Sequence, residues 1–205
     1  MDEAKDSYYS VSGESRGVYR DKASRFISIA MPVASEEEVK QELTKFRKAY
    51  HDANHHCYAY RLGPEDQTYR YNDDGEPSGS AGRPIYGQIL SSGVSDVLVV
   101  VVRYFGGTKL GVPGLINAYK TAAREALAGA AVIEKVVRVP FTVTCSYEVM
   151  NDVMRILKEE QARITSQNAM ETIEITFLVR KGMADRVEER LKRLKISSLR
   201  KEIIK

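Results

Sequence analysis

The sequence contains no tryptophan, only two cysteines and no long apolar run. Cys57 and Cys145 fall in different predicted strands, so we expect two reduced core thiols and not a disulfide framework. No segment reaches the roughly 18 apolar residues of a membrane-spanning helix, and residues 1–17 are acidic and polar without an apolar signal-peptide core. These absences exclude the membrane and disulfide-rich secreted classes and predict a cytoplasmic protein.

Two glycine-rich nucleotide-binding patterns are also missing. The stretch GGTKLGVPG at residues 106–114 has neither the G-x-x-x-x-G-K-S/T order nor the G-x-G-x-x-G order. ATP or NAD binding is therefore not expected, and the sequence predicts no cofactor.

What the chain does contain is the composition of an ordinary globular protein, with 43% apolar and 29% charged residues among 205. Its charge is uneven: residues 1–134 hold 16 basic and 18 acidic residues, net −2, whereas residues 135–205 hold 15 and 10, net +5. Residues 181–205 alone carry nine basic and four acidic side chains. This excess fits either a solvated helix face or a footprint for RNA or the ribosome.

The most distinctive stretch is a buried strand that leads through glycines into a helix. Six consecutive apolar residues, 97–102, predict a strand covered on both faces. Gly106 and Gly107 then permit positive φ or a close backbone approach, and a helix starts near Pro113. Because exposed amide groups and a helix N-terminus attract anions, we interpret this hinge, flanked by Arg103 and Lys109, as an anion-receiving site.

We assign Ser80 and Arg83 to the same anion site, and expect Arg103 and Lys109 at the surface. Phosphate groups of a nucleic-acid backbone need only amides and cations, which this loop offers. The alternative is a tight turn with a purely structural role.

The remaining elements predict two α+β domains, residues 1–134 and 135–205. The first is expected to hold a strand or hairpin within 17–33, a helix over 35–50, strands over 57–62 and 68–71 joined by a turn at 63–66, a helix over 80–90, and the long helix from Pro113. In the second, strict alternation over 137–145 predicts a strand with one wet face. A helix, a short strand over 163–166, a strand over 173–179, a second helix and a final strand over 196–204 complete the ferredoxin-like order βαββαβ.

The segment 51–57 contains His51, His55, His56 and Cys57, which suggests a metal site. It crosses a predicted junction between helix and strand, however, and no second cluster supplies further ligands at a familiar spacing. We therefore favour a packed cysteine beside a hydrogen-bonded histidine. A nucleophilic pair of His55 and Cys57 requires a third orienting group that the sequence does not identify.

Three acids, Asp73, Asp74 and Glu76, are candidates for paired acid–base chemistry. Asp74 and Gly75 form a turn signal and Pro77 follows directly, so turn-forming acids are favoured over catalytic ones. A calcium loop is excluded because Arg70 occupies its first ligand position.

Three segments together resemble the signature of the IMPACT/YigZ family: DDGEPSGSAG at 73–82, VVVVRYFGGTKL at 99–110 and ANHHCYA at 53–59. Ser80 stands where the pattern has threonine, and Pro113 where it has glycine; serine keeps the hydroxyl and proline is compatible with a helix start. The family motif would comprise His55, Cys57, Asp73, Asp74, Gly75, Glu76 and Pro77.

The resemblance implies an N-terminal IMPACT-like α/β sandwich similar to a ribosomal protein, and a C-terminal domain that resembles domains of elongation factor G. Eukaryotic relatives regulate translation by competing for a partner of a stress kinase, whereas bacterial members have no firmly assigned activity. We therefore expect a non-catalytic protein that contacts RNA, the ribosome or a translation factor. A protein-interaction adaptor and a small hydrolase that uses His55, Cys57 and the acids of 73–76 are the alternatives. No membrane partner is expected, and the sequence does not predict an oligomeric state.

Overall fold

The computed structural model describes residues 6–64 and 68–201, and the contacts within it divide the chain into two compact units. The N-terminal unit comprises residues 8–135, and the C-terminal unit comprises 136–201 with residues 6 and 7. Both units contain helices and strands, so the predicted mixed α and β class is confirmed. In the described ranges, no helix is long and apolar enough to cross a membrane.

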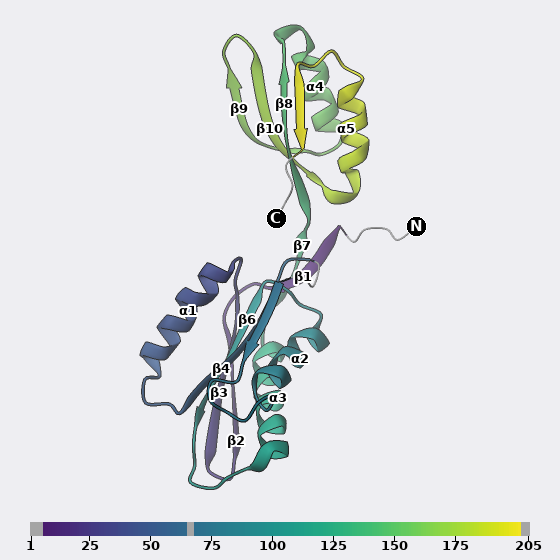
Figure 1. Ribbon diagram of the computed structural model, residues 1–205. Helices are drawn as coiled ribbons and strands as arrows, with labels where there is room; N and C mark the ends of the chain where they lie inside the picture. Colours follow the sequence, from purple (N-terminus) through teal and green to yellow (C-terminus); the bar gives the residue numbers. More distant parts are fainter. Residues whose placement is uncertain (1–5, 65–67, 202–205) are drawn as a thin grey trace. The chain divides into compact units, whose positions relative to one another are not determined.

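The N-terminal unit is built on a five-stranded sheet in the order β2-β3-β6-β4-β5 (Figure 1). Its strands are β2 (Ser15–Asp21), β3 (Ser24–Pro32), β4 (His55–Leu62), β5 (Thr68–Asn72) and β6 (Val97–Tyr104). The predicted central strand is β6, which pairs antiparallel with β3 and β4 and is buried from Val97 to Val102. The predicted turn at 63–66 lies partly outside the described residues.

Helices cover both faces of this sheet (Figure 1). On one face lies α1 (Glu36–Ala49), which begins as predicted at Ser35, whose hydroxyl accepts the N–H of Glu38 at 3.2 Å. On the other face lie α2 (Gly82–Ser92) and α3 (Gly111–Ala128).

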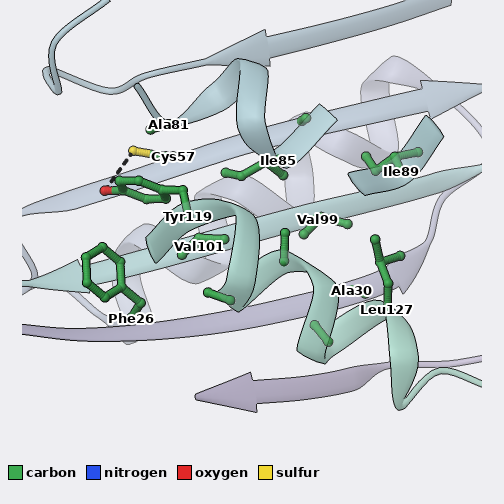
Figure 2. Packing of buried hydrophobic residues seen from close by; sticks show 14 of the residues in the cluster. Phe26, Ala30, Cys57, Ala81, Ile85, Ile89, Val99, Val101, Tyr119 and Leu127 are labelled. Atoms are coloured by element: carbon green, nitrogen blue, oxygen red, sulfur yellow. Dashed lines mark hydrogen bonds between the residues drawn. The ribbon is translucent and has the colours of Figure 1, made fainter. Parts of the chain in front are cut away.

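The core between the sheet and these two helices includes Tyr119 of α3, which is fully buried (Figure 2). Its ring meets that of Phe26 edge-on at 5.2 Å, and its hydroxyl lies 3.3 Å from the sulfur of Cys57. Alanines on the same side of α3, at 118, 122, 123 and 126, are also fully buried, which allows the helix to approach the sheet closely.

The C-terminal unit contains a four-stranded sheet in the order β11-β8-β10-β9. Its elements are β8 (Arg138–Cys145), α4 (Tyr147–Glu159), β9 (Arg163–Ala169), β10 (Ile173–Arg180), a short 3-10 turn (Lys181–Met183), α5 (Ala184–Lys192) and β11 (Ser198–Lys201). The predicted alternation in β8 is confirmed, with buried and half-buried residues in strict succession. The predicted last strand covers only 198–201 within the described range, and residues 202–204 of it lie outside that range.

A two-stranded sheet formed by β1 (Ser7–Val11) and β7 (Val132–Val136) is absent from the sequence-based prediction. The sequence patterns predict a polar stretch over 1–17 and a connector over 133–137. A residue far from both strands in the sequence explains the difference. Asp96 accepts hydrogen bonds from the Tyr8 hydroxyl at 2.5 Å and from Lys135 Nζ at 2.8 Å. A single carboxylate thus holds both strands, and local sequence patterns carry no signal of it.

Candidate functional site

A cleft of about 480 Å³ lies where β6 ends and α3 begins. Its walls come from the start of β4, the loop before α2, the end of β6, the glycine loop and the first turns of α3. The residues that line it are Asn54, His55, Glu76, Pro77, Arg103, Phe105, Lys109, Leu110, Gly111, Val112 and Leu115. The cleft therefore combines a polar side with an apolar side, and both belong to the N-terminal unit.

A buried ion pair forms part of the polar side. Arg103 Nη1 lies 2.5 Å from Glu76 Oε1, and the same oxygen accepts the hydroxyl of Tyr119 at 2.7 Å. The expectation that Arg103 is at the surface is wrong, since the residue is only 6% exposed. The reason is that β6 is the central strand, so its last residues are still covered by its neighbours, and Glu76 neutralises the charge that burial would otherwise disfavour.

The guanidinium of Arg103 is further enclosed by two aromatic rings. Its central carbon lies 5.5 Å from the ring centroid of Phe26 and 5.5 Å from that of Phe105. Its Nε, in contrast, is buried without a hydrogen-bond partner in the part of the chain that the structure describes. An unsatisfied buried donor of this kind costs about 1–3 kcal/mol of stability.

His55 contributes one ring nitrogen to the site. Its Nδ1 lies 2.8 Å from the carbonyl oxygen of Asp74. Because a carbonyl oxygen only accepts, Nδ1 donates this hydrogen bond, and Nε2 lies 3.9 Å from Glu76 Oε1. The imidazole is thus oriented by the loop that also supplies Glu76.

The two aspartates of that loop bind backbone groups of their own unit. The Asp73 carboxylate accepts the N–H groups of Gly79 at 2.9 Å, Ala81 at 3.0 Å and Gly82 at 2.8 Å, and so caps the start of α2. Asp74 accepts the N–H of His56 at 2.7 Å. This geometry favours the interpretation of both aspartates as turn-forming acids.

Gly106 has a structural role in the glycine loop. Its N–H donates to the hydroxyl of Ser24 at 3.1 Å, and a Cβ at this position would lie 2.1 Å from the carbonyl carbon of Ala23. The prediction that the hinge turns its amides outward is therefore wrong for Gly106. Gly107 differs: its φ is +84°, and a Cβ added there would have no described heavy atom within 4 Å apart from its chain neighbours.

With Arg103 paired and the Gly106 N–H bonded internally, the start of α3 is the remaining candidate for anion binding in the cleft. Its first turn reads Gly-Val-Pro-Gly from Gly111, and in the described structure the preceding residue Leu110 provides no side-chain cap. First-turn N–H groups of a helix lack intrahelical partners and bear partial positive charge. Gly111 and Val112 line the cleft, and the exposed Lys109 stands beside them.

The structure brings together only part of the predicted anion site. Arg103 and Lys109 line one cleft with Glu76 and His55, and Gly106 and Gly107 belong to the adjoining loop. Ser80 is buried and donates its hydroxyl to the carbonyl of Pro77 at 2.6 Å, while Arg83 is exposed in the first turn of α2. Neither Ser80 nor Arg83 is among the described residues that line the cleft.

Asn54 and Phe105 belong to the site although neither is among the predicted site residues; both lie in the segments 53–59 and 99–110 that resemble the family signature. Asn54 Oδ1 accepts the N–H of Phe105 at 2.7 Å and so fixes the loop to the start of β4. The sequence does offer one signal for Phe105: it is an aromatic residue between a buried strand and two glycines. An aromatic ring at the end of a strand is often not buried in the core, so it is a candidate for a binding surface.

Cys57 is a buried free thiol, as predicted, and so is Cys145. The Cys57 sulfur donates to the carbonyl of Asp73 at 3.0 Å, and burial raises the pKa of the thiol well above its usual range. Burial likewise raises the pKa of the neighbouring Tyr119. Within residues 6–64 and 68–201, no group of three or more histidine, cysteine, aspartate or glutamate side chains is arranged to hold a metal ion.

Comparison with known proteins shows the relationships of the chain. The Impact N-terminal domain family matches residues 22–127. The IMPACT family member YvyE of Bacillus subtilis is 34% identical over 174 residues, which cover 84% of this chain and 80% of that protein. The IMPACT family member YigZ of Escherichia coli is 34% identical over 149 residues, 72% of this chain and 73% of that protein. A crystal structure described as that of a hypothetical protein superposes over 98% of both chains with a TM-score of 0.72 and 28% identity.

Proposed function

Because this chain belongs to the IMPACT family, we propose that it is a cytoplasmic, non-catalytic protein of the translation apparatus that binds RNA phosphate groups at its cleft. The observation that carries this proposal is the start of α3, which opens without a side-chain cap in the described structure beside Lys109. A helix N-terminus with an adjacent lysine binds phosphate through amides and one positive charge.

The domain architecture is part of the same proposal. We assign residues 1–134 to an IMPACT-like α/β sandwich similar to a ribosomal protein. Residues 135–205 are assigned to a ferredoxin-like domain similar to those of elongation factor G. The sheet order β11-β8-β10-β9, with one helix after β8 and one after β10, supports the second assignment.

The basic residues of the C-terminal unit support a secondary contact and not the main one. Several of them are paired with acids of the same unit: Arg190 with Glu159 and Glu160, Lys192 with Glu188, and Lys201 with Asp185. Paired cations release fewer counterions when they meet a phosphate backbone. We therefore place the principal phosphate contact in the N-terminal unit.

A hydrolase at His55 and Cys57 is the weaker hypothesis. Burial raises the pKa of the Cys57 thiol, and a thiolate, not a thiol, is the nucleophile in such enzymes. The proton of His55 Nδ1 is directed to a backbone carbonyl. The buried Cys57 thiol is therefore not in the thiolate state that nucleophilic catalysis needs.

A protein-interaction adaptor is the second candidate, and a separate surface favours it. Tyr69 and Tyr71 of β5 are 50% and 42% exposed, and both rings lie against Tyr86 of α2, with centroids 4.7 Å and 6.0 Å away. Clustered tyrosines of this kind are enriched at protein interfaces. This aromatic patch, Tyr69, Tyr71 and Tyr86, is distinct from the cleft.

The test is co-sedimentation with ribosomes and filter binding to RNA, each at several salt concentrations. Lys109→Ala should weaken binding and reduce the log–log salt slope by about one unit. Lys120→Ala is the matched control, because Lys120 is an exposed lysine of α3 that does not line the cleft. Equal log–log salt slopes for the wild type and Lys109→Ala would show that RNA does not bind at the cleft. If the protein binds neither RNA nor ribosomes while the Tyr69→Ala variant loses a protein partner, the adaptor is correct.

A further inference from the structure

Phe105 is an exposed aromatic ring that the structure nevertheless holds in place. It is 45% exposed and lines the cleft. Its backbone N–H donates to Asn54 Oδ1, and its ring centroid lies 5.5 Å from the guanidinium carbon of the buried Arg103. Burial of a phenylalanine ring is strongly favourable, so an exposed and positioned ring at a cleft suggests a surface for a ligand.

The rest of the cleft matches a flat ring with polar edges. Its volume of about 480 Å³ is within the range of small-molecule sites. Leu110, Val112 and Leu115 form its apolar side, and Val112 is 47% exposed. Asn54 and His55 contribute to its polar side. A nucleobase offers an apolar face to the apolar side of the cleft and polar ring edges to its polar side.

We propose that this cleft receives one unstacked base of a single-stranded RNA, with the Phe105 ring as the stacking surface. The inference rests on the proposed RNA binding and names the form of RNA that the site takes. The phosphate of the same nucleotide lies toward Lys109 and the first turn of α3, so a single nucleotide contacts both sides of the cleft.

Two properties follow from this arrangement. A base inside a duplex keeps both faces stacked and cannot enter the cleft, so single strands bind more tightly than duplexes of the same length. Every base has an aromatic face, so the preference among sequences is weak. Stacking on one aromatic side chain changes affinity by about 5- to 150-fold when the ring is removed.

The experiment compares two labelled probes by fluorescence anisotropy at one fixed salt concentration. One is an oligouridylate of about 12 nucleotides, and the other is a ribose-phosphate oligomer of equal length without bases. The wild type should bind the oligouridylate at least about 5-fold more tightly than the abasic oligomer. Phe105→Ala should remove this difference, while Lys109→Ala should weaken binding of both probes by a similar factor.

Three further variants make the result specific to the ring. Phe105→Leu keeps an apolar side chain without an aromatic face, so it should behave like Phe105→Ala, whereas Phe105→Tyr should retain the preference. Tyr9→Ala removes an exposed aromatic side chain outside the cleft and should change neither affinity. Equal wild-type affinity for both probes would overturn the base-binding inference and leave phosphate binding in place. Failure to bind either probe would overturn the proposed function as well.

Discussion

Arg103 and Glu76 form an ion pair in the interior of the N-terminal unit, with side chains only 7% and 3% exposed. The pair joins the end of the central strand β6 to the loop before α2, and Tyr119 of α3 adds a hydrogen bond to the same carboxylate oxygen. Three elements of one unit therefore meet at a single carboxylate. The charge of Arg103 is already balanced there, which leaves Lys109 as the exposed cation among the described residues lining the cleft.

Removing one partner of this pair should destabilise the fold severely. We expect Arg103→Ala or Glu76→Ala to lower the free energy of unfolding by about 3–5 kcal/mol, because each leaves the other charge buried and uncompensated. Urea denaturation followed by circular dichroism measures the change. Lys109→Ala, at an exposed position, should stay within about 0.5 kcal/mol of the wild type. A change below about 1 kcal/mol for both pair variants would show that the pair does not hold the unit together.

The glycines of the loop should differ in their tolerance to alanine. Gly106→Ala should destabilise most, because its methyl group would lie 2.1 Å from the backbone of Ala23. Gly107→Ala meets no described atom within 4 Å, but its φ of +84° costs about 1–2 kcal/mol for an alanine. Gly87→Ala, in the interior of α2 with open space around it, should stabilise by about 0.5–1 kcal/mol. Thermal melts of the three variants would contradict the account if Gly106→Ala were the mildest.

Asp73 should control the start of α2. Asp73→Ala removes the acceptor of three backbone N–H groups, and we expect a loss of about 1–3 kcal/mol together with faster hydrogen exchange at Gly79, Ala81 and Gly82. Asp73→Asn keeps one carbonyl oxygen and should lose less. Unchanged exchange at all three amides in Asp73→Ala would rule out this capping role.

The fold and the site can be predicted from the sequence to different extents. Long local patterns are informative: the valines of β6, the Ser35 cap of α1 and the alternation in β8 all identify their elements correctly. The β1–β7 pair escapes such patterns because its stability depends on Asp96, which lies more than 80 residues from Tyr8.

The chemistry of the site depends on tertiary contacts that no local pattern encodes. Arg103 follows the apolar run at the end of β6, a place where an arginine usually reaches solvent, but the Glu76 carboxylate is available to it in the interior. Gly106 fits a phosphate loop as well as a tight packing contact, and only the position of Ala23 decides between them. Arg83 is close to the motif in sequence, yet α2 holds it away from the described lining of the cleft.

Asp96 should make the N-terminal unit sensitive to acid. Burial alone would raise the pKa of this carboxyl, but hydrogen bonds from Lys135, from the Tyr8 hydroxyl and from the Gly63 N–H outweigh it and hold the pKa below the usual range. A lowered folded-state pKa contributes stability above the unfolded-state pKa of about 4, and this contribution is lost as the pH falls through the folded value. Urea midpoints of the wild type should therefore fall below about pH 4.

The variant Asp96→Asn separates this group from the other carboxylates. It should be less stable than the wild type near neutral pH, because an amide cannot pair with the Lys135 ammonium. The difference between the two proteins should shrink as the solution is acidified, since the wild-type carboxyl becomes neutral as well. A difference that stays constant down to low pH would assign the acid sensitivity to other residues.

The most direct test of RNA binding at the cleft is an amide chemical-shift titration with oligouridylate. If the cleft is the site, the largest shifts should occur at residues 105–112 and at Asn54. Lys109→Ala should reduce these shifts at equal RNA concentration. Shifts confined to the C-terminal unit, or absent at residues 105–112, would contradict the account and leave the cleft as a structural turn.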